Sequence, residues 1–156
     1  MEIDENAKAQ FYSAWFYSGI RLSSSIEGHG SVEAIAEHLD LPRTRVRQVL
    51  EFLVANGLCE FKNGEYGMGP SRTHLDGSSS LVSRHHSNWR IKAFEKMDHQ
   101  TPEELFYTGP MAISAETMSE VRQEIIALID RMAKKVATSP SEQLACLNID
   151  FFKPTR

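Results

Sequence analysis

A group of polar side chains follows Pro42, and its residue types are suited to binding nucleic acid. The group consists of Arg43, Thr44, Arg45, Arg47 and Gln48. Arginine can donate two hydrogen bonds to guanine or contact a phosphate, and the amide of glutamine can bind adenine. This chemistry requires an element that presents the side chains together on an exposed surface.

Two helices joined by a tight turn are predicted around this group. The first begins after Ser31, whose hydroxyl can cap a helix, and its apolar face consists of Val32, Ile35, Ala36 and Leu39. Asp40-Leu41-Pro42 ends it, because proline disfavours helical geometry in the preceding residue and suits the first turn of a new helix. The second helix begins near Pro42 and ends at Gly57, and its apolar face consists of Val46, Val49, Leu50 and Leu53.

A β-hairpin is predicted after Gly57. Short apolar-alternating runs at 58–61 and 66–68 flank the sequence Lys62-Asn63-Gly64-Glu65. Asn-Gly between two such runs is the strongest short-range hairpin signal. The stretch from Ser31 to Met68 is therefore expected to form helix, turn, helix and β-ribbon.

This order of elements resembles the winged helix-turn-helix of bacterial transcription regulators. The resemblance is carried by SVEAIAEHLDLPRTRVRQVLEFLVANGL and the hairpin after it. It implies that the second helix enters the major groove of DNA with its early residues on base edges and phosphates. By this resemblance Arg43, Thr44, Arg45, Arg47 and Gln48 face DNA, and Lys62 and Asn63 lie at the tip of the wing.

The charge balance leaves a second function open. The chain has a formal net charge of −4, which provides no global attraction to a polyanion. Six acidic residues lie close to the basic group in sequence: Glu33, Glu37, Asp40, Glu51, Glu60 and Glu65. Winged helices also serve as protein-interaction or dimerisation modules, and exposed arginines can simply be solvated. We expect a DNA-binding transcription regulator, with an interaction module that does not bind DNA as the alternative.

Composition predicts an ordinary globular protein. Hydrophobic residues make up 41% of the 156 residues and charged residues 24%. No apolar run approaches the roughly 18–20 residues that span a bilayer, and the start MEIDENAK lacks the features of a signal peptide. We therefore expect a cytoplasmic protein without a membrane segment.

Neither a metal site nor an enzyme is predicted. His85 and His86 are adjacent on a predicted helix, so they point about 100° apart and cannot readily chelate one ion. Cys59 and Cys146 each lie in a predicted strand, which favours buried, reduced thiols. No nucleophile elbow, phosphate loop or metal quartet is present in the sequence. We expect no cofactor, and an effector, if there is one, is unknown.

Three further segments are predicted outside the winged helix. An aromatic helix covers about 7–25 and is expected to pack against a second partner besides the core. A linker rich in glycine, proline and serine covers 71–80. A helix follows over 81–97, with an apolar stripe that includes Trp89.

The last part of the sequence is predicted as strand, helix and strand. Extended pieces cover 105–108 and 111–113, a helix begins at Ser114, and an alternating strand covers 144–152. Two strands and one helix are too few to bury a core, so we expect a homodimer. The fold class is α+β, with an N-terminal helix and winged helix-turn-helix over 1–70, the linker over 71–80, and a dimerisation or sensing domain over 81–156.

Nearly the whole chain resembles a family of bacterial conserved hypothetical proteins from predatory and fibrolytic bacteria, a family known as a domain of unknown function. The resemblance rests on HHSNWRIKAFEKM, ISAETMSEVRQEIIALIDRMAKKV and QLACLNIDFFKPT, and extends upstream to Trp15-Phe16-Tyr17. Longer members resemble predicted transcription regulators with a further N-terminal helix-turn-helix, a module expected to be absent here. If that module reads DNA in longer members, the winged helix of this chain would be a sensor or dimeriser. The family implies no catalytic residues.

Overall fold

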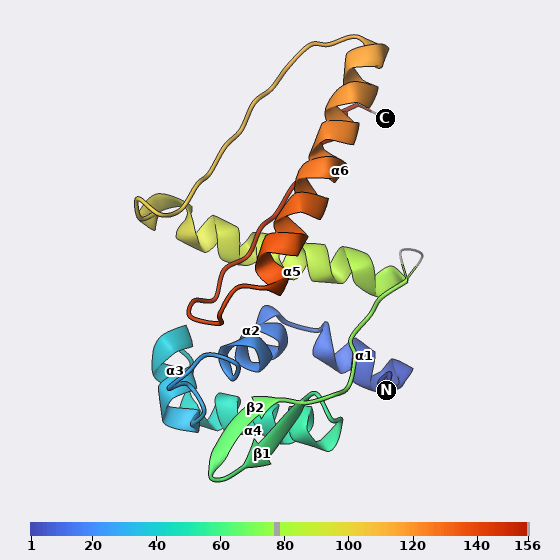
Figure 1. Ribbon diagram of the computed structural model, residues 1–156. Coiled ribbons are helices and arrows are strands. Elements are labelled where there is room, and N and C mark those ends of the chain that lie inside the picture. The colour runs from blue at the N-terminus through green and yellow to red at the C-terminus, as the bar shows by residue number, and fades with distance from the viewer. Residues whose placement is uncertain (77–78, 156) are drawn as a thin grey trace. The chain divides into compact units, whose positions relative to one another are not determined.

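A computed structural model of the chain describes residues 1–76 and 79–155. Gly77 and Ser78, which belong to the predicted linker, and Arg156 lie outside the described residues. The described part forms six α-helices and one two-stranded antiparallel sheet (Figure 1). It divides into two compact units: one comprises Met1–Lys96 with Ser141–Asn148, and the other comprises Met97–Pro140 with 149–155.

The first unit begins with two short helices, α1 (Glu5–Phe11) and α2 (Trp15–Ser23). The prediction of one helix over 7–25 is therefore wrong, because the backbone becomes extended at Ala14. The carbonyl oxygen of Tyr12 accepts a hydrogen bond of 2.8 Å from the Asn88 side chain. This bond satisfies a carbonyl at the break between α1 and α2. Its donor lies in a distant part of the sequence, so local helical periodicity does not reveal the break.

Helices α3 (Val32–Leu39) and α4 (Arg43–Ala55) confirm the two central helices that the sequence predicts. The hydroxyl oxygen of Ser31 accepts a hydrogen bond of 3.1 Å from the Ala34 amide, so Ser31 caps α3 as expected. Asp40 adopts a left-handed conformation at the end of α3, and α4 follows Pro42. Gly57, with φ of +70°, turns the chain out of α4.

The predicted hairpin is also confirmed. Strands β1 (Cys59–Lys62) and β2 (Glu65–Met68) pair antiparallel, and Lys62 opposite Glu65 closes the turn. Asn63 and Gly64 at the tip have positive φ values of 53° and 78°, which is the geometry that an Asn-Gly turn requires. The amide of Tyr66 donates a hydrogen bond of 2.8 Å to the carbonyl of Gly30, so the hairpin is held against the loop before α3.

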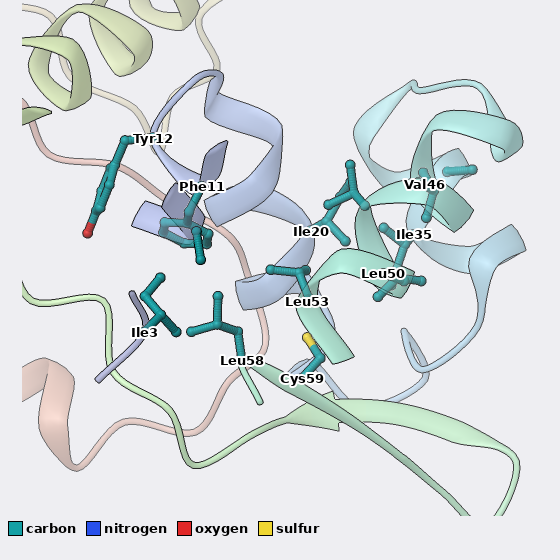
Figure 2. Close-up of a cluster of buried hydrophobic side chains, with 13 residues drawn as sticks. Ile3, Phe11, Tyr12, Ile20, Ile35, Val46, Leu50, Leu53, Leu58 and Cys59 are labelled. Atoms are coloured by element: carbon teal, nitrogen blue, oxygen red, sulfur yellow. The ribbon is translucent and has the colours of Figure 1, made fainter. Parts of the chain in front are cut away.

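The hydrophobic core lies in the first unit and joins these elements. Figure 2 shows Ile20 of α2, Ile35 of α3 and Leu50 and Leu53 of α4 packed together. Each of these four side chains is fully buried. Ile3, Phe11 and Leu58 extend the core towards α1. Burial of an aliphatic side chain stabilises a fold by about 1.5–3 kcal/mol, so this core fixes the orientation of α4.

Helix α5 (Ser80–Lys96) packs on α2 within the same unit. The rings of Trp15 and Trp89 meet edge to face with centroids 6.0 Å apart, and the Lys92 ammonium lies 4.3 Å from the centroid of the Trp15 ring. Asn88 is buried and makes the bond to Tyr12 described above. The aromatic residues of the N-terminal region thus have a packing partner in α5.

The described part of the predicted linker lies against the core. Ser71 is buried, and its carbonyl accepts a hydrogen bond of 2.8 Å from the Nη2 atom of Arg21. The Nε atom of Arg21 donates a second hydrogen bond, of 2.9 Å, to the carbonyl of Leu58. The hydroxyl of Tyr12 donates to the carbonyl of Thr73. These bonds attach the segment after β2 to α1 and α2.

The second unit contains the 3₁₀ turn η1 (Met97–His99) and helix α6 (Ala115–Ala137). The hydroxyl oxygen of Ser114 accepts a hydrogen bond of 3.0 Å from the Thr117 amide, which confirms the predicted start of this helix. Figure 1 shows a long segment without helix or strand between η1 and α6. Within 97–140 and 149–155, the described residues of this unit, none is buried.

The strands predicted at 105–108, 111–113 and 144–152 are wrong. The structure assigns no strand to any of these segments. A strand needs a partner to satisfy its backbone hydrogen bonds, and alternation of apolar residues alone does not supply one. Cys146 lies in the last of these segments and is exposed, so only Cys59 confirms the expectation of a buried thiol.

Candidate nucleic-acid interface

The seven residues predicted to contact DNA all lie on the surface of the first unit. Five are on the first turns of α4, and two are at the tip of the hairpin. All are exposed: Arg43, Thr44, Arg45, Arg47, Gln48, Lys62 and Asn63. The structure therefore keeps each of them accessible to a partner.

The side chains on α4 are distributed over three sides of the helix. The buried residues Val46, Val49, Leu50 and Leu53 define the side that faces the core. Successive residues are separated by about 100° around the axis, so Thr44 and Gln48 lie opposite the core. Arg43 and Arg47 are four residues apart and share one flank, whereas Arg45 lies on the other flank.

Arg45 has a packing partner inside the protein. Its guanidinium carbon lies 4.7 Å from the centroid of the Phe16 ring on α2. A cation over an aromatic face at this distance is attracted by the ring quadrupole. Arg45 thus helps to hold α2 against α4. The excess of aromatic residues near Phe16 was the only sequence signal for such a contact.

Arg43 and Arg47 are in a different situation. In the described part of the chain, neither has an ion pair with a carboxylate. Helix α4 contains three arginines and one acidic residue, Glu51, and its first turn contains no acidic residue. This flank therefore carries two arginines without an ion pair, with Glu51 one turn beyond Arg47.

The N-terminus of α4 adds to this positive potential. Pro42 occupies the N-cap position and makes no side-chain hydrogen bond to the first amides of the helix. Unpaired amides and the helix dipole both attract negative charge at a helix N-terminus. Arg43 lies at this end, so the positive flank of α4 and the helix terminus act on the same region of solvent.

Lys62, at the tip of the hairpin, is less available to an anion than its exposure alone indicates. The Nζ atom of Lys62 lies 3.3 Å from a carboxylate oxygen of Glu60, and both side chains are largely exposed. The two residues are two positions apart on β1, so their side chains leave the same face of the strand. This spacing was the sequence signal for the pair. A phosphate would have to compete with Glu60 for Lys62.

Two histidines lie side by side: His29 is in the loop before α3, and His38 is in the last turn of α3. The rings of His29 and His38 have centroids 4.5 Å apart. Partial burial, together with the neighbouring His29, lowers the pKa of His38 below its ordinary value. His29 is half-buried. Its proximity to His38 was not foreseen, because the two residues are in different elements.

Two further features are absent from residues 1–76 and 79–155. No group of three or more His, Cys, Asp or Glu side chains is placed to hold a metal ion there. No helix in the same residues is long and apolar enough to cross a membrane.

This surface can bind an anion beside a face that carries polar side chains. Arg43 and Arg47 can contact phosphates, while Thr44 and Gln48 carry hydrogen-bonding groups opposite the core. The core side chains of α4 fix the backbone from which all four project.

Comparison with known proteins identifies the family of the chain. No curated protein and no solved structure matches it. The sequence model of the family described as "Domain of unknown function (DUF4423)" matches residues 1–153, and the chain therefore belongs to this family.

Proposed function

We propose that the chain is a DNA-binding transcription regulator of the cytoplasm. Helices α3 and α4 act as a helix-turn-helix, and the β1–β2 hairpin acts as its wing. Helix α4 enters the major groove, Thr44 and Gln48 meet base edges, and Arg43 and Arg47 contact phosphates on one side. Lys62 and Asn63 approach the sugar-phosphate backbone of the DNA beside that groove.

The observation that carries this proposal is the positive flank of α4. Arg43 and Arg47 are exposed, share a flank and lack an ion pair in the described residues. Exposed arginines that only solubilise a surface are usually interspersed with acidic partners. Here the one acidic residue of the helix, Glu51, follows Arg47 by four residues on the same flank, and the two form no ion pair. The flank is thus suited to an anionic partner.

A protein-interaction module that does not bind DNA is the second candidate. The formal net charge of −4 favours it, because long-range electrostatics then oppose approach to a polyanion. The ion pair between Lys62 and Glu60 also favours it, because the wing then offers little free positive charge. This candidate would use the same face of α4 to bind a protein partner.

Fluorescence anisotropy distinguishes the two candidates. Labelled duplexes from the promoter of the protein's own gene and of random sequence are titrated with the full chain at low and at moderate salt. The proposal expects saturable binding at low salt that weakens as salt rises, because bound phosphates release counterions. Absence of binding to either duplex at low salt would overturn it and favour the interaction module.

Matched variants locate the binding surface. The double variant Arg43→Ala/Arg47→Ala is compared with Arg84→Ala/Lys153→Ala, which removes the same charge from exposed positions elsewhere. The first should lose affinity for both duplexes, and the second should bind as the parent does. Gln48→Ala should reduce the preference for the promoter duplex more than it reduces affinity for the random one, because a base contact specifies while a phosphate contact positions.

A further inference from the structure

Helix α6 carries an apolar stripe in which Leu128 is exposed, the other members are half-buried and none is fully buried. Along its 23 residues, Met118, Val121, Ile125, Leu128 and Met132 recur with alternating spacings of three and four. This repeat is the seam of a two-stranded coiled coil. Leu128 is 42% exposed, and the flanking residues Ile129 and Val136 are 45% and 72% exposed. Apolar surface that stays accessible along one helix in this way marks an interaction site.

The rest of the second unit also lacks a core. The segment before α6 exposes large apolar side chains, including Leu105 at 88% and Tyr107 at 82%. None of the described residues of this unit is buried. A unit that buries so little apolar surface gains little from the hydrophobic effect by itself. A partner that covers the stripe would supply the missing burial.

The charges along α6 indicate which partner fits. The first half of the helix contains Glu116, Glu120 and Glu124 with a single arginine, whereas Arg131, Lys134 and Lys135 follow in the second half with a single aspartate. The two halves are thus opposite in sign. A second α6 laid antiparallel places the acidic half of each helix beside the basic half of the other, and a parallel one places like charges together.

We infer that α6 is the surface through which two copies of this chain associate, as an antiparallel helix pair with twofold symmetry. Ile125 packs against Leu128 of the second copy, and Val121 packs against Met132 of the second copy. Such a contact is isologous, so it closes after two chains and buries the same stripe on both. It also aligns the helix dipoles in the favourable, opposed sense.

One charge pair determines the register of the two helices. Glu124 and Arg131 each directly precede a residue of the seam, and they are seven residues apart. They therefore occupy equivalent positions beside the seam. In an antiparallel pair these positions face each other across the seam, so Glu124 of each copy meets Arg131 of the other. Neither residue has an ion pair within its own described chain. Both therefore remain available to the second copy.

Charge-swap variants of the full chain test this assignment by light scattering and sedimentation, without DNA. The parent should behave as a dimer of the 17.6 kDa chain at micromolar concentration. Glu124→Arg and Arg131→Glu each replace two attractions with two repulsions, so each should raise the dissociation constant about tenfold or more. Mixed in equal amounts, the two variants should form a heterodimer as tight as the parent. Glu120→Arg makes the same charge change on the outward side of α6, away from the seam, and should raise the dissociation constant far less than Glu124→Arg does.

Three results would overturn the assignment. One is a parent that stays monomeric across the micromolar range. Another is single variants that dimerise as tightly as Glu120→Arg. The third is a mixture that fails to restore association while circular dichroism shows each variant folded. Pairing of α6 is independent of DNA contact by α4, because size is measured on the protein alone and Arg43 and Arg47 stay unchanged.

Discussion

The guanidinium of Arg45 lies over the ring of Phe16, with 4.7 Å between the guanidinium carbon and the ring centroid. This contact joins α4 to α2 and distinguishes Arg45 from Arg43 and Arg47, which project on the opposite flank of the same helix. The three arginines lie within five residues of sequence but have different surroundings. Their substitutions should therefore have different consequences.

Replacement of Arg45 should reduce stability, whereas replacement of Arg43 or Arg47 should not. Arg45→Ala removes the cation over Phe16 and should lower the free energy of unfolding by about 0.5–1 kcal/mol. Arg43→Ala and Arg47→Ala are expected to stay within about 0.5 kcal/mol of the parent, since they are exposed and without protein partners. Urea denaturation of the three variants measures the difference. Equal stabilities for all three would show that the contact with Phe16 contributes nothing.

Asn88 should be among the most sensitive polar positions in the chain. Its buried amide donates a hydrogen bond of 2.8 Å to the carbonyl of Tyr12, at the break between α1 and α2. Asn88→Ala leaves that carbonyl without its partner and should cost about 1–3 kcal/mol. Ser87→Ala, at an exposed position of the same helix, is the control and should be nearly neutral. Chemical denaturation compares them, and similar losses in both would contradict the role given to Asn88.

Acid pH should weaken the packing of α5 through His85. Partial burial lowers the pKa of His85, and the neighbouring charges of His86 and Arg90 lower it further. Its ring meets that of Tyr12 edge to face at 5.2 Å. Because the folded pKa lies below that of the unfolded chain, about 6.5, the unfolded state binds more protons as pH falls. The stability from neutral His85 is present above about pH 6.5 and is lost as pH drops through the folded value.

The size of this effect is measured as a difference between variants. The parent should lose more stability than His85→Gln between about pH 8 and pH 5.5, because only the parent carries the half-buried imidazole. His85→Phe keeps an aromatic contact with Tyr12 and should show the same reduced pH dependence. If all three proteins lose stability equally over this range, His85 does not contribute to it.

Helices and the hairpin could be predicted because their signals are local. The cap at Ser114 and the Asn63-Gly64 turn each act within one or two turns of chain, and the structure has both. The break at Tyr12 could not be predicted, because Asn88 lies 76 residues away. The strands expected at 105–108 and 144–152 failed for a related reason: alternation describes a segment, whereas a strand requires a partner.

The candidate site was predictable in part. Burial of Val46, Val49, Leu50 and Leu53 follows from helical spacing, and the exposure of the five polar residues on α4 follows from it in turn. Which arginine is bound within the protein did not follow, because the contact of Arg45 with Phe16 joins separate helices. Tertiary packing, rather than residue type, separates Arg45 from its two neighbours.

The salt dependence of DNA binding tests the role of α4 most directly. The slope of log K against log salt concentration is measured for the parent and for Arg43→Ala/Arg47→Ala, with Arg84→Ala/Lys153→Ala as the control. Each lost phosphate contact lowers the slope by about one unit, so the first variant should be shallower than the parent by about two units and the control should match the parent. An Arg43→Ala/Arg47→Ala variant that keeps the affinity and slope of the control would contradict DNA contact by this flank of α4.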